Sequence, residues 1–139
     1  SFRYSSSSRG SSWMRIPDGC TWSTKLQSKP TKGFANPSGV LINEVMPDPA
    51  SGKEWVEIYN PSSCVVNTSG WKLKDKAGYM GSWTESTISA GSYTLVEFSN
   101  KLNNGGDTLT LLSSKNQHVD SYEYASSFDG KSWMRMPDA

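Results

Sequence analysis

The sequence predicts an all-β domain in which two sheets pack as a sandwich. About seven short segments are rich in β-branched and aromatic residues, and turns dense in Gly, Pro, Asn and Ser separate them. No segment keeps a helical period. Several segments alternate apolar and polar residues, which is typical of strands with one face in a core and the other in water. An antiparallel barrel is the alternative, and the sandwich is the more economical architecture.

The strand pattern begins after Gly39 and continues to the end of the chain. Pro47-Asp48-Pro49 ends the first strand, and the run Asn103 to Asp107 is a turn before the last hairpin. The predicted strands are 40–46, 54–60, 71–75, a weaker one at 84–88, 93–98, 108–112 and 118–124. The core candidates are Trp55 or Val56, Trp71, Leu95, Leu109 and Leu111.

The two ends of the chain repeat each other. Residues 12–18 read Ser-Trp-Met-Arg-Ile-Pro-Asp and residues 132–138 read Ser-Trp-Met-Arg-Met-Pro-Asp. When 1–19 is laid over 121–139, eleven of the nineteen positions are identical without a gap. A repeat spaced by one domain length predicts three parts. They are the terminal strand and closing motif of a preceding or neighbouring copy (1–19), an ordered linker (20–37) and one complete domain (38–139).

The repeated heptad is expected to be structural. Its Trp can pack on the sandwich, its Arg can reach a carboxylate or backbone carbonyls, and Pro-Asp can turn the chain outward. Residues 1–4 alternate aromatic and polar side chains, as one half of a strand does. The candidate assembly or domain-end residues are Phe2, Tyr4, Trp13, Arg15, Pro17, Asp18, Trp133, Arg135, Pro137 and Asp138.

Two cysteines, Cys20 and Cys64, are too few for a disulfide scaffold and lack metal-ligand spacing. A single disulfide is the favoured interpretation, and two buried free thiols are the alternative. The bridge would close a loop of roughly 45 residues, worth about 4 kcal/mol in the chain-entropy model. A composition rich in Ser, Thr, Gly and Asn also favours an extracellular or cell-surface location. Asn67-Thr68-Ser69 is a weak glycosylation sequon.

Charge and hydropathy exclude several classes of partner. The formal net charge is +1, without a basic run, so a nucleic-acid partner is not expected. No apolar run approaches the ~18 residues of a membrane span, and no signal-peptide pattern opens the chain.

The chemistry-bearing residues favour structural roles. His118 has no accompanying nucleophile motif, and the Trp and Tyr side chains could form a sugar platform but serve most simply as core. Asn104-Gly105-Gly106 lacks the lysine and the helix of a phosphate loop. We therefore expect no enzyme activity, no cofactor, no metal site and no small-molecule substrate. The carboxylates weighed were Glu44, Glu54 and Glu57 as an acid/base pair, and Asp48, Asp75, Asp107 and Asp120 as calcium ligands.

Five motifs come in the order of a known family. They are Leu41-Ile42-Asn43-Glu44-Val45, the run Trp55 to Asn60, Ser69-Gly70-Trp71-Lys72-Leu73, the run Leu102 to Leu109, and the closing heptad. Together they resemble the lamin tail domain in its prokaryotic-type form, over roughly residues 38–139. The resemblance implies an immunoglobulin-like β-sandwich and a non-catalytic module. Such modules occur in nuclear lamins and in secreted or surface proteins, where they accompany hydrolases or serve as adhesion and structural units. Cys20, Cys64 and a start within the family's last strand depart from the pattern.

These observations lead to one expected function and one alternative. We expect a structural domain that self-associates head to tail in an extracellular filament, sheath or surface fibre. Its partners would be copies of itself, joined as tandem repeats or by donation of the strand Ser1 to Tyr4. The alternative is an accessory module of a secreted multidomain hydrolase that binds polysaccharide, cell wall or DNA.

Overall fold

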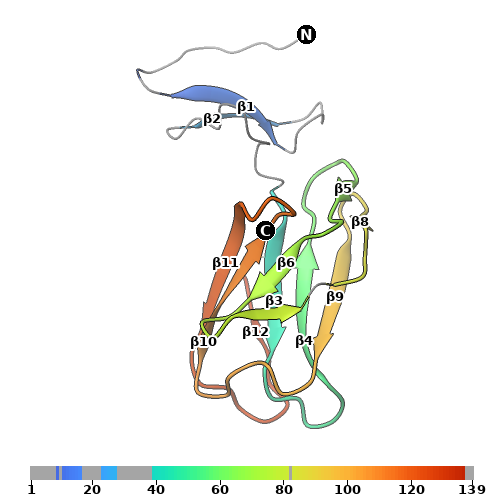
Figure 1. The fold of residues 1–139 in the computed structure, drawn as a ribbon, viewed down its shortest axis with the longest axis vertical. Helices are drawn as coiled ribbons and strands as arrows, with labels where there is room; N and C mark the ends of the chain where they lie inside the picture. The colour runs from blue at the N-terminus through green and yellow to red at the C-terminus, as the bar shows by residue number, and fades with distance from the viewer. Residues whose placement is uncertain (1–8, 10, 17–22, 28–38, 82, 137–139) are drawn as a thin grey trace.

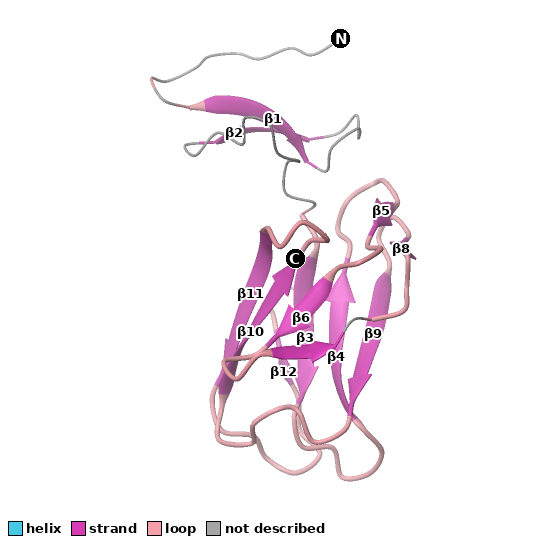
Figure 2. Cartoon of the chain, in the orientation of Figure 1, coloured by secondary structure: helices cyan, strands magenta, loops and turns pink. Residues whose placement is uncertain are grey.

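The computed structural model describes residues 9, 11–16, 23–27, 39–81 and 83–136. Every regular element in these residues is a strand, as Figure 2 shows. None of the described residues forms a helix long and apolar enough to cross a membrane. The predicted all-β class is confirmed.

Two four-stranded antiparallel sheets form the body of the domain, as Figure 1 shows. The first sheet has the order β12–β3–β4–β9, and the second has the order β11–β10–β6–β7. The strands of the first are β3 (Leu41–Met46), β4 (Glu54–Tyr59), β9 (Tyr93–Phe98) and β12 (Trp133–Met134). Those of the second are β6 (Lys72–Lys74), β7 (Tyr79–Gly81), β10 (Asp107–Leu112) and β11 (His118–Tyr124).

Alternation along the strands builds the core between the two sheets. In β4, Val56 and Ile58 are fully buried, whereas Trp55 and Tyr59 are only half-buried and face outward. The period of two follows from the pleat, because successive side chains point to opposite faces. Other core residues are Val40, Ile42, Val45, Trp71, Leu73, Val96, Phe98, Leu109 and Leu111. The sandwich interpretation is therefore correct.

A separate two-stranded sheet lies at the end of the sandwich where β4 ends (Figure 1). It joins β5 (Val66–Asn67) to β8 (Thr87–Ile88). Asn60, directly after β4, is fully buried, and its amide Nδ2 donates to the carbonyls of Cys64, Ile88 and Ser89. A buried amide with this many partners fixes the loops around it, because each unmade bond would cost desolvation energy.

A separate hairpin precedes the sandwich. It pairs β1 (Ser12–Ile16) with β2 (Ser23–Gln27), and Trp13 lies opposite Leu26 in the register. Figure 1 shows this hairpin outside the sandwich. The strand expected at Ser1 to Tyr4 lies outside the described residues. So do Pro17, Asp18, Cys20, Pro137 and Asp138.

The strands at 93–98 and 118–124 have the predicted bounds, and the predicted weak strand at 84–88 is reduced to β8. Leu95 was wrongly assigned to the core, since its exposed fraction is 55%. Its strand places Val96 and Phe98 inward, so Leu95 shares the solvent face with Tyr93 and Glu97. The strands β5, β7 and β12 are too short for a sequence period to reveal them.

Candidate functional site

The C-terminal copy of the heptad is the edge strand of the first sheet. Trp133 pairs with Val45 and Met134 with Glu44, and the Arg135 amide donates to the Asn43 carbonyl at 2.9 Å. Trp133 is partly buried against the core. The ladder itself is only two residues long, so side chains must supply much of the attachment of β12.

Arg135 supplies that attachment by joining the two sheets. Its Nε donates to the Ile42 carbonyl of β3 at 2.7 Å. Its terminal nitrogen donates to Asp120 Oδ2 at 2.8 Å and to the Ser121 carbonyl at 3.0 Å, both on β11. Asp120 Oδ2 also accepts from the Ile42 amide at 2.8 Å. We call Ile42, Asp120, Ser121 and Arg135 the terminal clasp.

The terminal clasp is only partly open to solvent. The side chains of Arg135 and Asp120 keep 30% and 15% of their exposure. The guanidinium also lies over the ring of Tyr122, 5.3 Å from its centroid. Burial raises the pKa of Tyr122, the Arg135 charge lowers it, and Glu44 raises it. The Arg135–Asp120 pair is partly shielded from water, and the guanidinium also donates to two backbone carbonyls. We therefore expect the terminal clasp to contribute more to stability than an ordinary surface ion pair does.

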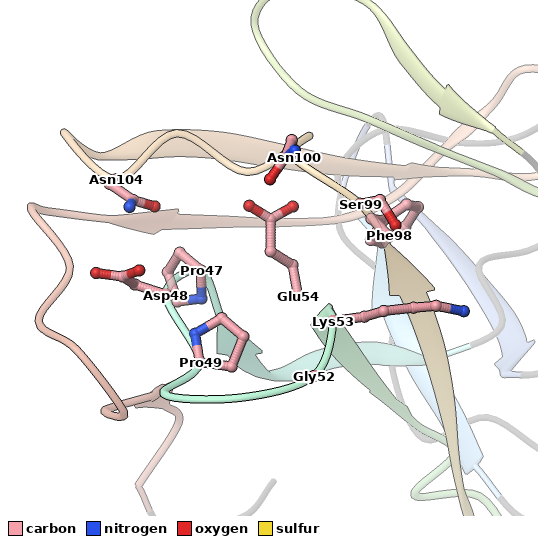
Figure 3. Close-up of a pocket in the computed structure, with 10 residues that line it drawn as sticks. All are labelled: Pro47, Asp48, Pro49, Gly52, Lys53, Glu54, Phe98, Ser99, Asn100 and Asn104. Atoms are coloured by element: carbon pink, nitrogen blue, oxygen red, sulfur yellow. The ribbon is translucent and has the colours of Figure 1, made fainter.

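A cleft of about 360 Å³ lies beside Glu54, between the loop that joins β3 to β4 and the segment that follows β9. Figure 3 shows the Glu54 carboxylate directed toward Asn100, whereas Lys53 points away from it. Glu54 is buried, and its Oε2 accepts from the amides of Lys101 and Leu102 at 2.7 and 3.0 Å. The carboxylate therefore holds the turn that follows β9. No group of three metal-ligating side chains occurs among the described residues.

Asp75 and Asp107, which were also considered as calcium ligands, accept backbone amides near turns. Asp75 Oδ1 accepts from the Gly78 amide at 2.7 Å. Asp107 is buried, and its Oδ1 accepts from the amides of Thr108 and Lys76. These carboxylates act as turn residues, which is the ordinary role of Asp at such positions.

Apart from the buried Glu54, the residues weighed for catalysis are half-buried or exposed positions on β3, β4 and β11. Glu44 and Glu57 lie opposite each other in the register of β3 and β4, and each carboxylate accepts a neutral donor, Ser132 Oγ and Asn43 Nδ2 respectively. His118 is exposed and contacts Ser121 Oγ at 2.7 Å. Glu44, Glu57 and His118 line neither the cleft beside Glu54 nor the one beside Trp83, so Glu54 alone of the residues weighed for catalysis lies in either of these clefts, where it already holds a turn.

The outer face of the first sheet carries three aromatic side chains, those of Trp55, Tyr59 and Tyr93. The rings of Tyr59 and Tyr93 stack with centroids 4.4 Å apart, and Leu95 lies on the same face. Trp55, half-buried, faces outward on the same strand as Tyr59. By contrast Tyr124 is buried and donates its hydroxyl to the Asn103 carbonyl, so it cannot form a sugar platform. Burial, with Asp107 nearby, raises the pKa of Tyr124 to about 12.

The remaining predicted modification sites lie near β5. Cys64 is half-buried, and no free cysteine occurs among the described residues. Its pairing with Cys20 stays a prediction, because Cys20 lies outside them. Asn67 is exposed, and its Oδ1 accepts from the Ser69 amide at 2.9 Å.

The geometry brings Trp133 and Arg135 of the heptad together with β3 and β11. Arg135 has the kind of partners expected of it, one carboxylate and two carbonyls. The sequence did not identify the role of Asp120, which was weighed only as a calcium ligand. Its place in a hydrophilic strand carried no signal for an arginine partner. Trp13 and Arg15 lie in β1, where they are separated from the sandwich.

Comparison with known proteins agrees with this fold. A family model described as Lamin Tail Domain matches residues 34–126. No curated protein matches the chain. The matched region contains nearly the whole two-sheet sandwich and ends before the terminal heptad. The match covers well over half of the sequence, so the chain belongs to the lamin tail domain family, whose fold is immunoglobulin-like.

Proposed function

We propose that this lamin tail domain is a non-catalytic structural unit that self-associates head to tail in an extracellular filament, sheath or surface fibre. One observation carries the proposal. The heptad that closes this sandwich as β12 is present a second time at residues 12–18, of which Ser12–Ile16 form β1 of the hairpin. This second heptad has the sequence of a closing strand, so it is suited to a second copy of the domain, either in tandem or in a neighbouring chain.

The described surface supports association better than chemistry. The Glu54 carboxylate, which lines the cleft beside β4, already holds a turn. The outer face of the first sheet presents Tyr93 and Leu95, which are 45% and 55% exposed. Exposed aromatic and aliphatic side chains on one sheet face are typical of protein contact surfaces.

We further propose that a Cys20–Cys64 disulfide stiffens the junction between copies. It would tie the segment that follows the first heptad to the loop after β4. Mass spectrometry of the non-reduced, digested chain should find the two cysteine peptides linked. Two free thiols per chain would contradict this part of the proposal.

A second candidate function is an accessory binding module, which the outward aromatic face favours. Trp55 and the stacked pair Tyr59–Tyr93 could contact a polysaccharide. This function predicts that soluble oligosaccharides quench the tryptophan fluorescence of the chain, with loss of the effect in Trp55→Ala. The structural function predicts no quenching.

Sedimentation velocity over a wide concentration range tests self-association directly. The account predicts species heavier than the 15.3 kDa chain whose share grows with concentration. A single 15.3 kDa species at every concentration would contradict the proposed function.

A further inference from the structure

We propose that the strand Ser12–Ile16 of one chain takes the place of β12 on the β3 edge of a second copy, and that this exchange is the joint between copies. The inference rests on the proposed function and names the surfaces that meet. The donor is a described strand of this chain, and the acceptor is the edge that β12 occupies here.

The donor carries the residues that hold β12 in place. In β12 and its flanks the attachments come from Ser132, Trp133 and Arg135. Residues 12, 13 and 15 are the same Ser, Trp and Arg in the same order. The only difference within the heptad is Ile16 in place of Met136, and Met136 is 81% exposed. Every residue that the acceptor recognises is therefore present in the donor.

The present partner of the donor resembles β3. In the hairpin, Trp13 lies opposite Leu26 and Met14 opposite Lys25. In the sandwich, Trp133 lies opposite Val45 and Met134 opposite Glu44. In the register, each Trp thus lies opposite an aliphatic residue and each Met opposite a charged one. The strand β2 reproduces this pairing pattern of the β3 edge, but the described residues of β1 and β2 include no carboxylate that corresponds to Asp120.

Exchange conserves the number of strand pairs. When Ser12–Ile16 of one chain occupies the β3 edge of another, the displaced β12 can pair with the vacated β2 in the same register. Because β12 has a ladder of only two residues and lies at the sheet edge, few backbone hydrogen bonds oppose its displacement. Such swaps of equivalent elements are a low-cost route to assembly.

The chain has the reach that the exchange needs. Twenty-four residues separate Ile16 from Leu41, and at up to ~3.3 Å per residue they span as much as about 80 Å. This reach exceeds the diameter of one domain, because a domain of roughly 100 residues has a radius of gyration near 13 Å. One chain can therefore keep its own sandwich while its first heptad lies on the next.

Disulfide trapping between two differently substituted copies of the 139-residue chain tests the exchange. Met134 and Glu44 are a non-hydrogen-bonded pair, because the next pair carries the bond from the Arg135 amide to the Asn43 carbonyl. One chain carries Met14→Cys and the other carries Glu44→Cys, so that only contact between chains can link 14 to 44. A single chain with Met134→Cys and Glu44→Cys is the positive control. A second pair, Ser12→Cys with Met46→Cys, repeats the test at the next position on that face.

We expect a 14–44 linkage by peptide mass spectrometry. Adding Arg135→Ala to the acceptor should raise its yield about 10-fold, since the chain's own strand is then held by fewer charged hydrogen bonds. Arg15→Ala in the donor should abolish this gain, whereas Arg9→Ala, an exposed arginine before the heptad, should leave it unchanged.

The outcomes separate this inference from the proposed function. Linkage at neither pair, in chains that form oligomers by sedimentation, overturns the exchange and leaves self-association intact. Linkage that is insensitive to both Arg15 and Arg135 also overturns it, because heptad recognition would not be involved. Chains that remain 15.3 kDa monomers and show no linkage overturn both.

Discussion

Replacing Arg135 by alanine tests the terminal clasp. The change removes three hydrogen bonds from the guanidinium, one to Ile42 and two to β11. Hydrogen bonds to charged groups contribute about 1.5–3 kcal/mol each when well shielded, and the 30% exposure of this side chain reduces that value. We expect Arg135→Ala to lower the free energy of unfolding by about 2–3 kcal/mol. Urea unfolding, followed by tryptophan fluorescence, measures it.

A double-mutant cycle isolates the ionic part of the terminal clasp. Arg135→Ala combined with Asp120→Asn should give a coupling energy of about 1–2 kcal/mol, because Asp120 keeps only 15% of its exposure. The matched control is the pair Lys53 and Glu97, separated by 3.5 Å, with side chains 60% and 58% exposed. That pair should couple by less than about 0.5 kcal/mol. Equal coupling in the two cycles would refute the reasoning.

Three further predictions follow from local structure. Gly106→Ala should lower the free energy of unfolding in urea by about 3 kcal/mol, because the residue has φ +103° and an added Cβ would lie 2.9 Å from the Tyr124 carbonyl oxygen. The control Gly91→Ala, at φ +62° with open space around the added Cβ, should lower it by about 1 kcal/mol, and equal losses in the two variants would contradict the packing argument. The pKa of Tyr124 is about 12 in the folded chain, compared with an ordinary value of 10.0, so the free energy of unfolding should fall by about 2 kcal/mol as the pH rises from 10 to 12. Tyr124→Phe should show a smaller fall over the same range, measured by urea unfolding. Reduction of a Cys20–Cys64 bond should lower the midpoint of thermal unfolding, a change that cannot occur in a Cys20→Ser variant.

The fold was predictable because its long strands carry a clear period. Residues 93–98 and 118–124 were bounded correctly, since both are rich in β-branched and aromatic residues and are framed by turn residues. The face of β9 was not predictable by hydrophobicity alone. Leu95 and Val96 are both apolar, and only the packing of Val96 and Phe98 on the core decides which side faces inward.

The terminal clasp was only half predictable. Repetition of the heptad identified Trp133 and Arg135, and their residue types indicated packing and hydrogen bonding. The acceptors could not be found in the same way, because Ile42 contributes backbone atoms and lies 93 positions from Arg135. Backbone acceptors leave no trace in a side-chain pattern. Asp120 could be found only once the strand order brought β11 next to β3.

Electron microscopy of the concentrated 139-residue chain tests most directly the central claim that copies of this domain join end to end. The account predicts filaments with an axial repeat of about 40 Å, close to the length of one domain of roughly 100 residues. A strand tethered to its own domain has an effective local concentration of about 1 mM. If the chain is more concentrated than this and still gives single dispersed particles without an axial repeat, the claim is contradicted.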